Sequence, residues 1–134
     1  MLRGLVAETS RIAIVDLEAG LEHLSRATAG YVDTLLVVGE PYFKSLEAAQ
    51  RSFALARDLG IEAIHMVANK LRSPRDEETV REFAARHGLD IIALIPYDTA
   101  VIEADERGVA LIEHGADAPS VGAIRKLADR LLAA

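Results

Sequence analysis

Ile-Ala-Ile-Val-Asp-Leu-Glu-Ala-Gly-Leu-Glu-His, residues 12–23, is the stretch that decides the predicted fold. An apolar run rich in β-branched residues ends on Asp16, and Gly20 follows at the start of a helical pattern. An aspartate after a buried strand can hold Mg²⁺ through water, and a glycine amide can approach a phosphate closely. Taken alone, Asp16 is better explained as an N-cap or turn aspartate at the end of the strand; the nearby Gly20 favours the phosphate-binding interpretation.

The residues before this stretch are equally informative. Only eleven residues precede Ile12, and none of them forms a glycine-rich phosphate loop with a lysine. The sequence therefore predicts half of a nucleotide site.

Composition and charge narrow the class of protein. The 134 residues are 51% hydrophobic and 27% charged, which is typical of one globular domain, and we expect a single domain over residues 1–134. The net charge of −6 disfavours binding to nucleic acid or to a membrane surface. No apolar run reaches the roughly 20 residues of a spanning helix, and the absence of cysteine fits a reducing compartment. We expect a cytoplasmic protein.

Short apolar runs alternate with helical patterns along the chain. Four runs lack polar alternation and are predicted to be strands of a parallel sheet covered on both faces; they are residues 11–16, 33–39, 63–69 and 90–95. Helical patterns follow, ending at Gly60, Gly88 and Gly108. A terminal helix is expected with Ser120 as its N-cap, and residues 1–9 are expected to be the last turns of another helix. The prediction is an α/β fold of about four parallel strands flanked by helices.

The carboxyl ends of the predicted strands carry polar or turn-forming residues. In an open parallel sheet these ends meet at the edge where ligands bind. Asn69 and Lys70 follow the third run, and Pro96 and Tyr97 follow the fourth. The Asn69 amide can donate to and accept from a purine edge, the lysine stem can pack along the ring, and Tyr97 can form an aromatic wall. The alternative is two strands ending in ordinary polar loops.

Arg72 bears on the choice of base. In guanine-specific phosphate-loop proteins that share an asparagine–lysine corner, an aspartate two residues after the lysine accepts the guanine amino group. Here that position is Arg72, which can only donate. We therefore expect adenine rather than guanine. The four histidines show no pair at metal-ligand spacing and are interpreted as structural or exposed.

The order of these motifs resembles that of a known family. Residues 15–29 are similar to the switch II region of the CooC-type nickel-insertion ATPases for carbon monoxide dehydrogenase, which belong with MinD, ParA and the nitrogenase iron protein. The likeness continues through residues 32–33, 40–41, 59–61, 67–70 and 95–97, so it covers most of the chain. It identifies the chain as the carboxyl-terminal part of such an ATPase, a partial phosphate-loop NTPase (SIMIBI, MinD-like) fold without the phosphate-loop strand.

The resemblance also implies roles for individual residues. Asp16 would be the Mg²⁺-side aspartate, binding through water, and Gly20 would sense the γ-phosphate of ATP. Asn69, with Lys70 beside it and the backbone around Pro96 and Tyr97, would frame adenine.

It further implies a dimer and a metalloenzyme client such as carbon monoxide dehydrogenase. The family's phosphate loop, its switch I aspartate and its CxC metal-binding pair do not occur in the sequence. In the family the phosphate-loop strand lies in the middle of the sheet, so its apolar neighbours would favour association, and we expect a homo-oligomer. We do not expect the chain to hydrolyse ATP alone, because the amides and lysines that stabilise phosphoryl transfer are absent.

Three functions remain open from the sequence. The chain is part of an ATP-binding metallochaperone, a dimerisation or partner-docking module without nucleotide chemistry, or an unrelated α/β domain in which Asp16 and Asn69 are incidental turn residues. We favour the first.

Overall fold

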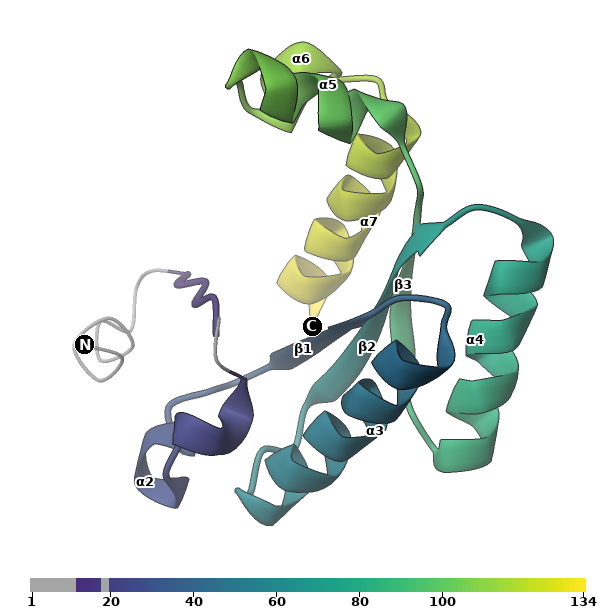
Figure 1. Cartoon of the computed structure of the whole chain (residues 1–134). Helices are drawn as coiled ribbons and strands as arrows, with labels where there is room; N and C mark the ends of the chain where they lie inside the picture. The colour runs from purple at the N-terminus through teal and green to yellow at the C-terminus, as the bar shows by residue number, and fades with distance from the viewer. Residues whose placement is uncertain (1–11, 18–19) are drawn as a thin grey trace.

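A computed structural model describes residues 12–17 and 20–134. Within these residues three parallel strands form one sheet in the order β1-β2-β3, with β1 at Leu35–Gly39, β2 at Ile64–Leu71 and β3 at Ile91–Pro96 (Figure 1). The α/β class and the parallel sheet flanked by helices are confirmed. Each strand lies within two residues of its predicted bounds.

The predicted strand at residues 11–16 is wrong for the part that the structure describes. Residues 12–16 have no strand pairing, and Ile12 and Ile14 are 77% and 94% exposed. An apolar β-branched run marks residues that suit a sheet interior, but a strand also needs a neighbour for its peptide groups. The expected helix at residues 1–9 lies outside the described residues.

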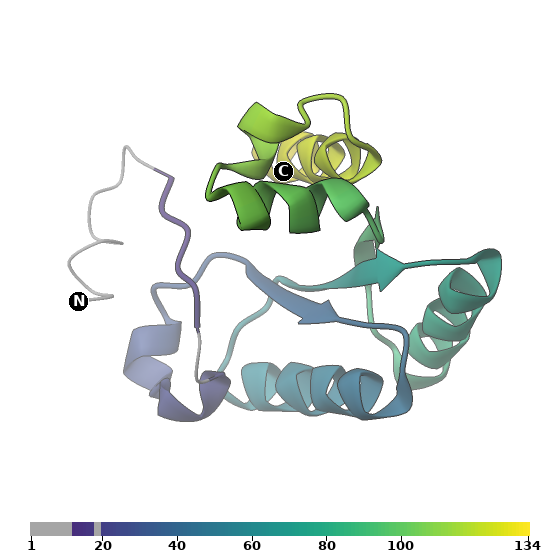
Figure 2. The same ribbon diagram turned by 45° about the horizontal axis from the view of Figure 1, so that its top comes forward.

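The two faces of the sheet are covered by different helices (Figure 2). On one face, α3 (Phe43–Asp58) and α4 (Pro74–His87) follow β1 and β2 and form the larger core. Its central side chains are fully or almost fully buried, and they include Leu46, Phe53, Met66 and Val80. The short elements η1 (Leu21–His23) and α2 (Arg26–Ala29) continue this layer beside α3.

The opposite face is covered by α7 (Pro119–Ala133), with α5 (Thr99–Arg107) and α6 (Leu111–His114) nearby. Leu127 of α7 packs on Val67 and Ala93 of the sheet in a smaller core. Both α4 and α5 end at glycines in the left-handed region, Gly88 and Gly108, as their positions predicted.

The start of α7 corrects one expectation. Its N-cap is Ala118 and Pro119 is the first helical residue, so Ser120 is not a cap. Instead Ser120 is buried, and both its backbone N–H and its hydroxyl donate to Asp98, at 3.0 and 2.8 Å. Asp98 also accepts from Ala100 N–H at 3.0 Å and caps α5, so one carboxylate joins the starts of two helices.

Candidate nucleotide site

The carboxyl edge of the sheet brings the ends of β1 and β2 into direct contact. Lys70 Nζ lies 2.6 Å from Glu40 Oε1. Ser45 fixes the backbone of Glu40, because its Oγ accepts the Glu40 N–H at 2.8 Å. The Lys70 ammonium lowers the pKa of the Glu40 carboxyl, and Glu40 in turn raises the pKa of Lys70.

An irregular end of β2 makes this contact possible. The register between β2 and β3 shifts between Ala68 and Leu71, and Lys70 has a φ of 58°, in the left-handed region. A bulge re-aims the side chains within it, and a lysine held at positive φ is strained. Asn69 and Lys70 therefore lie at a kinked strand end, with Asn69 half-buried and Lys70 exposed.

The ends of β2 and β3 are joined in the same region. Tyr97 N–H donates to Leu71 O at 2.8 Å, and Asp76 Oδ2 accepts the Arg72 N–H at 2.7 Å. These bonds hold the Arg72 guanidinium over the Tyr97 ring, with its Cζ atom 4.4 Å from the ring centroid. A guanidinium at this distance from an aromatic face makes a favourable cation–π contact.

Asp16 and Gly20 lie in a different part of the chain. Both are exposed, and Gly20 has a φ of 76°, a conformation that favours glycine. A Cβ atom added at Gly20 would meet Glu22 Oε2 at 3.6 Å and no backbone. Among the described residues, no hydrogen bond or ion pair joins Asp16 or Gly20 to the ends of β2 and β3.

Sequence reasoning thus identified four residues that fall at the ends of neighbouring strands: Asn69, Lys70, Pro96 and Tyr97. It missed Glu40 as the partner of Lys70 and Arg72 as the partner of Tyr97. Glu40 follows the apolar run at residues 33–39, so the convergence of strand ends places it at this edge, but that rule does not give its ion pair with Lys70. The Arg72–Tyr97 stack depends on backbone bonds after the two strands, which no spacing rule gives.

The described residues fit the base of a nucleotide better than its phosphates. A half-buried amide and a flat aromatic ring suit a purine. A triphosphate needs several converging N–H groups or cations, and the nearby Lys70 is already paired with Glu40. The described residues contain no group of three or more potential metal ligands.

Comparison with known proteins agrees with this geometry. Residues 1–112 match the model of the CobQ/CobB/MinD/ParA nucleotide binding domain. The chain belongs to this family. It is 39% identical over 110 residues to the carbon monoxide dehydrogenase accessory protein CooC of Rhodospirillum rubrum, covering 82% of this chain and 41% of that protein.

Two further relatives extend the comparison. An uncharacterized ATP-binding protein of Methanocaldococcus jannaschii is 38% identical over 109 residues, covering 81% of this chain and 42% of that protein. The solved structure of the MinD cell division protein of Aquifex aeolicus has a TM-score of 0.70 at 19% identity, over 86% of this chain and 50% of that one. The family model and the two curated relatives show the family, and the likeness to MinD shows the fold. The chain spans less than half the length of these two curated relatives.

Within residues 12–17 and 20–134, no helix combines the length and the apolar character needed to cross a membrane.

Proposed function

We propose that this chain supplies the adenine-binding side of an ATP site in a CooC-like protein. Asn69 reads the purine edge, and the backbone at Pro96 with the ring of Tyr97 forms one wall. Lys70 orients the end of β2 through its ion pair with Glu40. The observation that supports this most is the convergence of three strand ends on Glu40, Lys70 and the Arg72–Tyr97 stack.

Adenine is favoured over guanine by the donors in this region. Arg72 presents only N–H groups, and it occupies the position where an acceptor would read the guanine amino group. Its guanidinium is held over Tyr97. A guanine amino group approaching this side would meet a donor, which leaves both groups without a partner.

The phosphate side of the site is incomplete in the described residues. We propose that Asp16 binds Mg²⁺ through water and that Gly20 approaches the γ-phosphate. Gly20 is exposed, with a backbone conformation that favours glycine, which suits close approach to an anion. The electrostatic stabilisation of phosphoryl transfer would have to come from groups beyond these, so we expect no hydrolysis by the chain alone.

The cellular role that we propose is based on the named relative. We propose a place in maturing a metalloenzyme such as carbon monoxide dehydrogenase, with nickel as the cargo, in the cytoplasm and as a homo-oligomer. The single domain over residues 1–134 would be the carboxyl-terminal part of a longer nucleotide-binding architecture. A partner-docking role without nucleotide is the second candidate, and the open edge of β1 favours it.

Calorimetric titration of the chain with Mg·ATP and with Mg·GTP tests the proposal. We expect saturable binding that is tighter for ATP, and weaker binding of ATP by Asn69→Ala. The matched control is Glu78→Gln, an exposed change on α4 that should leave binding unaltered. Equal affinity for the two nucleotides, or no binding of either nucleotide, would exclude the adenine-side assignment.

A further inference from the structure

The residue that follows the proposed adenine wall joins two helices. The wall consists of the backbone at Pro96 and the ring of Tyr97, and Asp98 comes directly after it as the N-cap of α5. Its two carboxylate oxygens serve different helices. Oδ1 accepts the Ala100 N–H of α5 at 3.0 Å, and Oδ2 accepts both the N–H and the hydroxyl of Ser120 in α7, at 3.0 and 2.8 Å. The carboxylate therefore cannot rotate without losing bonds to one helix, and this fixes the backbone beside the wall.

Asp98 is needed at the start of α7 because that helix has no side-chain cap of its own. Its N-cap is Ala118, whose side chain accepts no hydrogen bond, and its first residue, Pro119, has no N–H. The Ser120 N–H is therefore the first N–H of the helix that needs an acceptor. Asp98 provides this acceptor from another part of the chain, as an N-cap aspartate would do within its own helix. The first turn of α7 and Asp98 thus fix each other.

The hydroxyl of Ser120 makes the second of these bonds inside the protein. Ser120 is 1% exposed, and among the described residues it is the one polar residue that is buried to this degree. A hydrogen bond from a buried hydroxyl to a carboxylate is stronger than one between neutral, exposed groups. Removal of the hydroxyl would leave Oδ2 of Asp98 with one donor fewer on a side that Ser120 shields from water. The buried bond therefore contributes directly to the position of Asp98.

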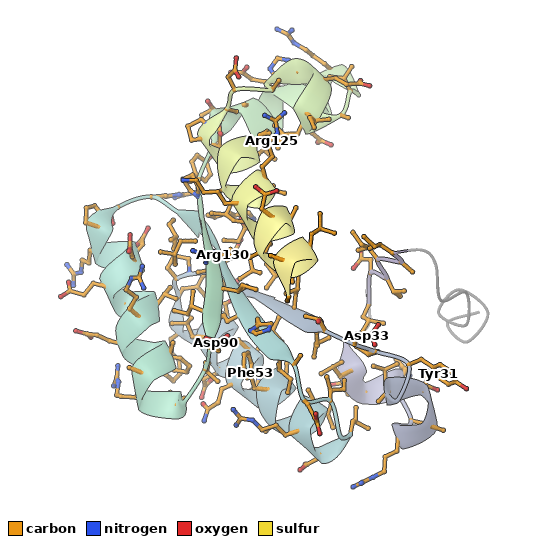
Figure 3. The ribbon with its side chains drawn as sticks, turned by 180° about the vertical axis from the view of Figure 1, so that it is seen from behind. Tyr31, Asp33, Phe53, Asp90, Arg125 and Arg130 are labelled. Carbon is orange, nitrogen blue, oxygen red and sulfur yellow. The ribbon has the colours of Figure 1, made fainter. Side chains whose placement is uncertain are left out.

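The helix that carries Ser120 is itself attached to the sheet. In Figure 1, α7 runs from the end of the molecule that holds α5 and α6 toward the strands. Arg130, labelled beside β3 in Figure 3, donates to the carbonyl of Ile92. Leu127 packs on Ala93 in the small core on the same face. Because the later turns of α7 are bound to β3 and its first turn is bound to Asp98, the helix supports Asp98 from the sheet.

A separate set of contacts holds the wall from the side of β2. Tyr97 N–H donates to Leu71 O at 2.8 Å, and the Arg72 guanidinium lies over the Tyr97 ring, with its Cζ atom 4.4 Å from the ring centroid. These contacts fix the amino side of Tyr97 and its ring relative to β2. They do not reach Asp98. The peptide that joins Tyr97 to Asp98 is therefore held by β2 at one end and by α7 at the other.

We propose that Ser120, acting through Asp98, is a positioning residue for the adenine wall. Its two bonds to Asp98 hold the peptide after Tyr97 where the ring and the Pro96 backbone meet the base. Ser120 is too deeply buried to contact a nucleotide, so it acts only through Asp98. The part of this inference that concerns affinity for adenine rests on the proposed function. The part that concerns the position of the wall does not.

The link between the two regions acts in both directions. If the bonds between Ser120 and Asp98 favour the arrangement of the wall that binds adenine, then adenine must favour those bonds by the same factor. Hydrogen exchange at the Ser120 amide should therefore slow when ATP binds, although this amide lies in α7 and outside the base site. The start of α7 thus responds to occupation of the end of β3.

The test is Ser120→Ala in the full 134-residue chain. This change removes the hydroxyl, keeps the Ser120 N–H, and introduces a strong helix former, so the circular dichroism should not change. Without nucleotide, hydrogen exchange at the Tyr97 amide should accelerate about threefold to tenfold, the value of one hydrogen bond. The Met66 amide, which donates to Asp90 O near the other end of the β2–β3 pair, is the internal reference and should not change. Unchanged exchange at Tyr97, or equal acceleration at Tyr97 and Met66, would overturn the inference, since the second result describes a general loss of stability.

Calorimetry with adenosine and with Mg·ATP tests the effect on binding. Ser120→Ala should weaken both ligands by the same factor of about threefold to tenfold, because the wall contacts only the base. The matched control is Ser52→Ala, which removes a hydroxyl that donates to Ala48 O within α3, on the opposite face of the sheet. It should change neither the affinities nor the exchange at Tyr97.

The two measurements separate this inference from the proposed function. If the wild-type chain binds neither adenosine nor ATP, the proposed function fails, and exchange at Tyr97 alone decides whether Ser120 positions this segment. If the wild-type chain binds both and Ser120→Ala binds them equally well, the inference fails and the proposed function stands. Equal weakening by Ser52→Ala and Ser120→Ala would also contradict the role of Ser120.

Discussion

Lys70 Nζ and Glu40 Oε1, 2.6 Å apart, join the carboxyl ends of β2 and β1 across the sheet edge. The pair depends on the kink at Lys70, whose φ of 58° lies in the left-handed region. The strain at this residue and the ion pair that it allows occur at the edge where we propose that the base of a nucleotide binds. Strained backbone concentrates at functional sites, and the following predictions start from this edge.

Replacement of Glu40 should alter the acid stability of the protein. Lys70 lowers the pKa of Glu40 below its ordinary value of 4.5, so the pair stabilises the fold above that pH. This contribution is lost as the pH falls through the lowered pKa. Glu40→Gln should lower the melting temperature slightly at pH 7, and the difference from wild type should vanish in acid. The pair is exposed, so the effect is small.

The control for this change is Glu78→Gln, which removes one carboxylate from the exposed face of α4. It should not reproduce the pH-dependent difference. A Glu40→Gln protein whose melting-temperature difference from wild type stays the same from pH 7 to pH 3 would show that the ion pair does not contribute to folding.

Asp98 should contribute to the stability of the protein by joining the starts of α5 and α7. Its carboxylate accepts three hydrogen bonds from Ala100 and Ser120, which lower its pKa below the ordinary 3.8. Asp98→Asn weakens this junction and should reduce the melting temperature at neutral pH. Because the contribution of a depressed carboxylate is lost in acid, the difference should narrow as the pH falls below 3.8. Asp105→Asn, an exposed change on the same helix, should have little effect in thermal melts.

Gly39 is closely packed against Met66. A Cβ atom at this position would lie 2.9 Å from Cε of the fully buried Met66. Gly39→Ala should lower the free energy of unfolding by about 1–3 kcal/mol through overpacking. A Cβ atom added at Gly122 on α7 would have no neighbour within 4 Å, so Gly122→Ala should raise the free energy of unfolding by about 0.5–1 kcal/mol. Urea denaturation of the two variants measures both changes in the free energy of unfolding, which should be opposite in sign. A neutral Gly39→Ala would mean that Met66 moves aside without cost.

Arg72 should control the choice between purines. Arg72→Asp replaces a donor by an acceptor and removes the contact over Tyr97. The ratio of the dissociation constants for ATP and GTP should shift toward GTP by about tenfold, the value of one hydrogen bond to a charged group. Arg75→Asp, an exposed change in the first turn of α4, makes the same charge change and should leave the ratio unaltered. An unchanged ratio in both variants would remove Arg72 from the site.

Apolar runs and glycine positions were sufficient to predict most of the fold. β1, β2 and β3 are buried or half-buried over most of their length, so their composition reports their environment. Gly88 and Gly108 end helices because they adopt positive φ. The run at residues 12–16 has the same composition but no partner strand in the described chain. Composition records suitability for a sheet, whereas pairing depends on what lies beside the run.

The candidate site was predictable only in part. Asn69 and Tyr97 could be located because strand ends converge in a parallel sheet. The pairing of Lys70 with Glu40 depends on a bulge near the end of β2, and Ser120 is buried because Asp98 reaches across to it. Such contacts join residues that are distant in sequence, and no local pattern encodes them.

The most direct test of the central claim is an NMR titration that follows the side-chain amide of Asn69 as Mg·ATP and Mg·GTP are added. The account predicts saturable chemical-shift changes at Asn69 and at the backbone amides of Lys70 and Tyr97, larger with ATP than with GTP. Shifts confined to other parts of the chain, or equal shifts with the two nucleotides, would contradict an adenine site at the carboxyl ends of β2 and β3.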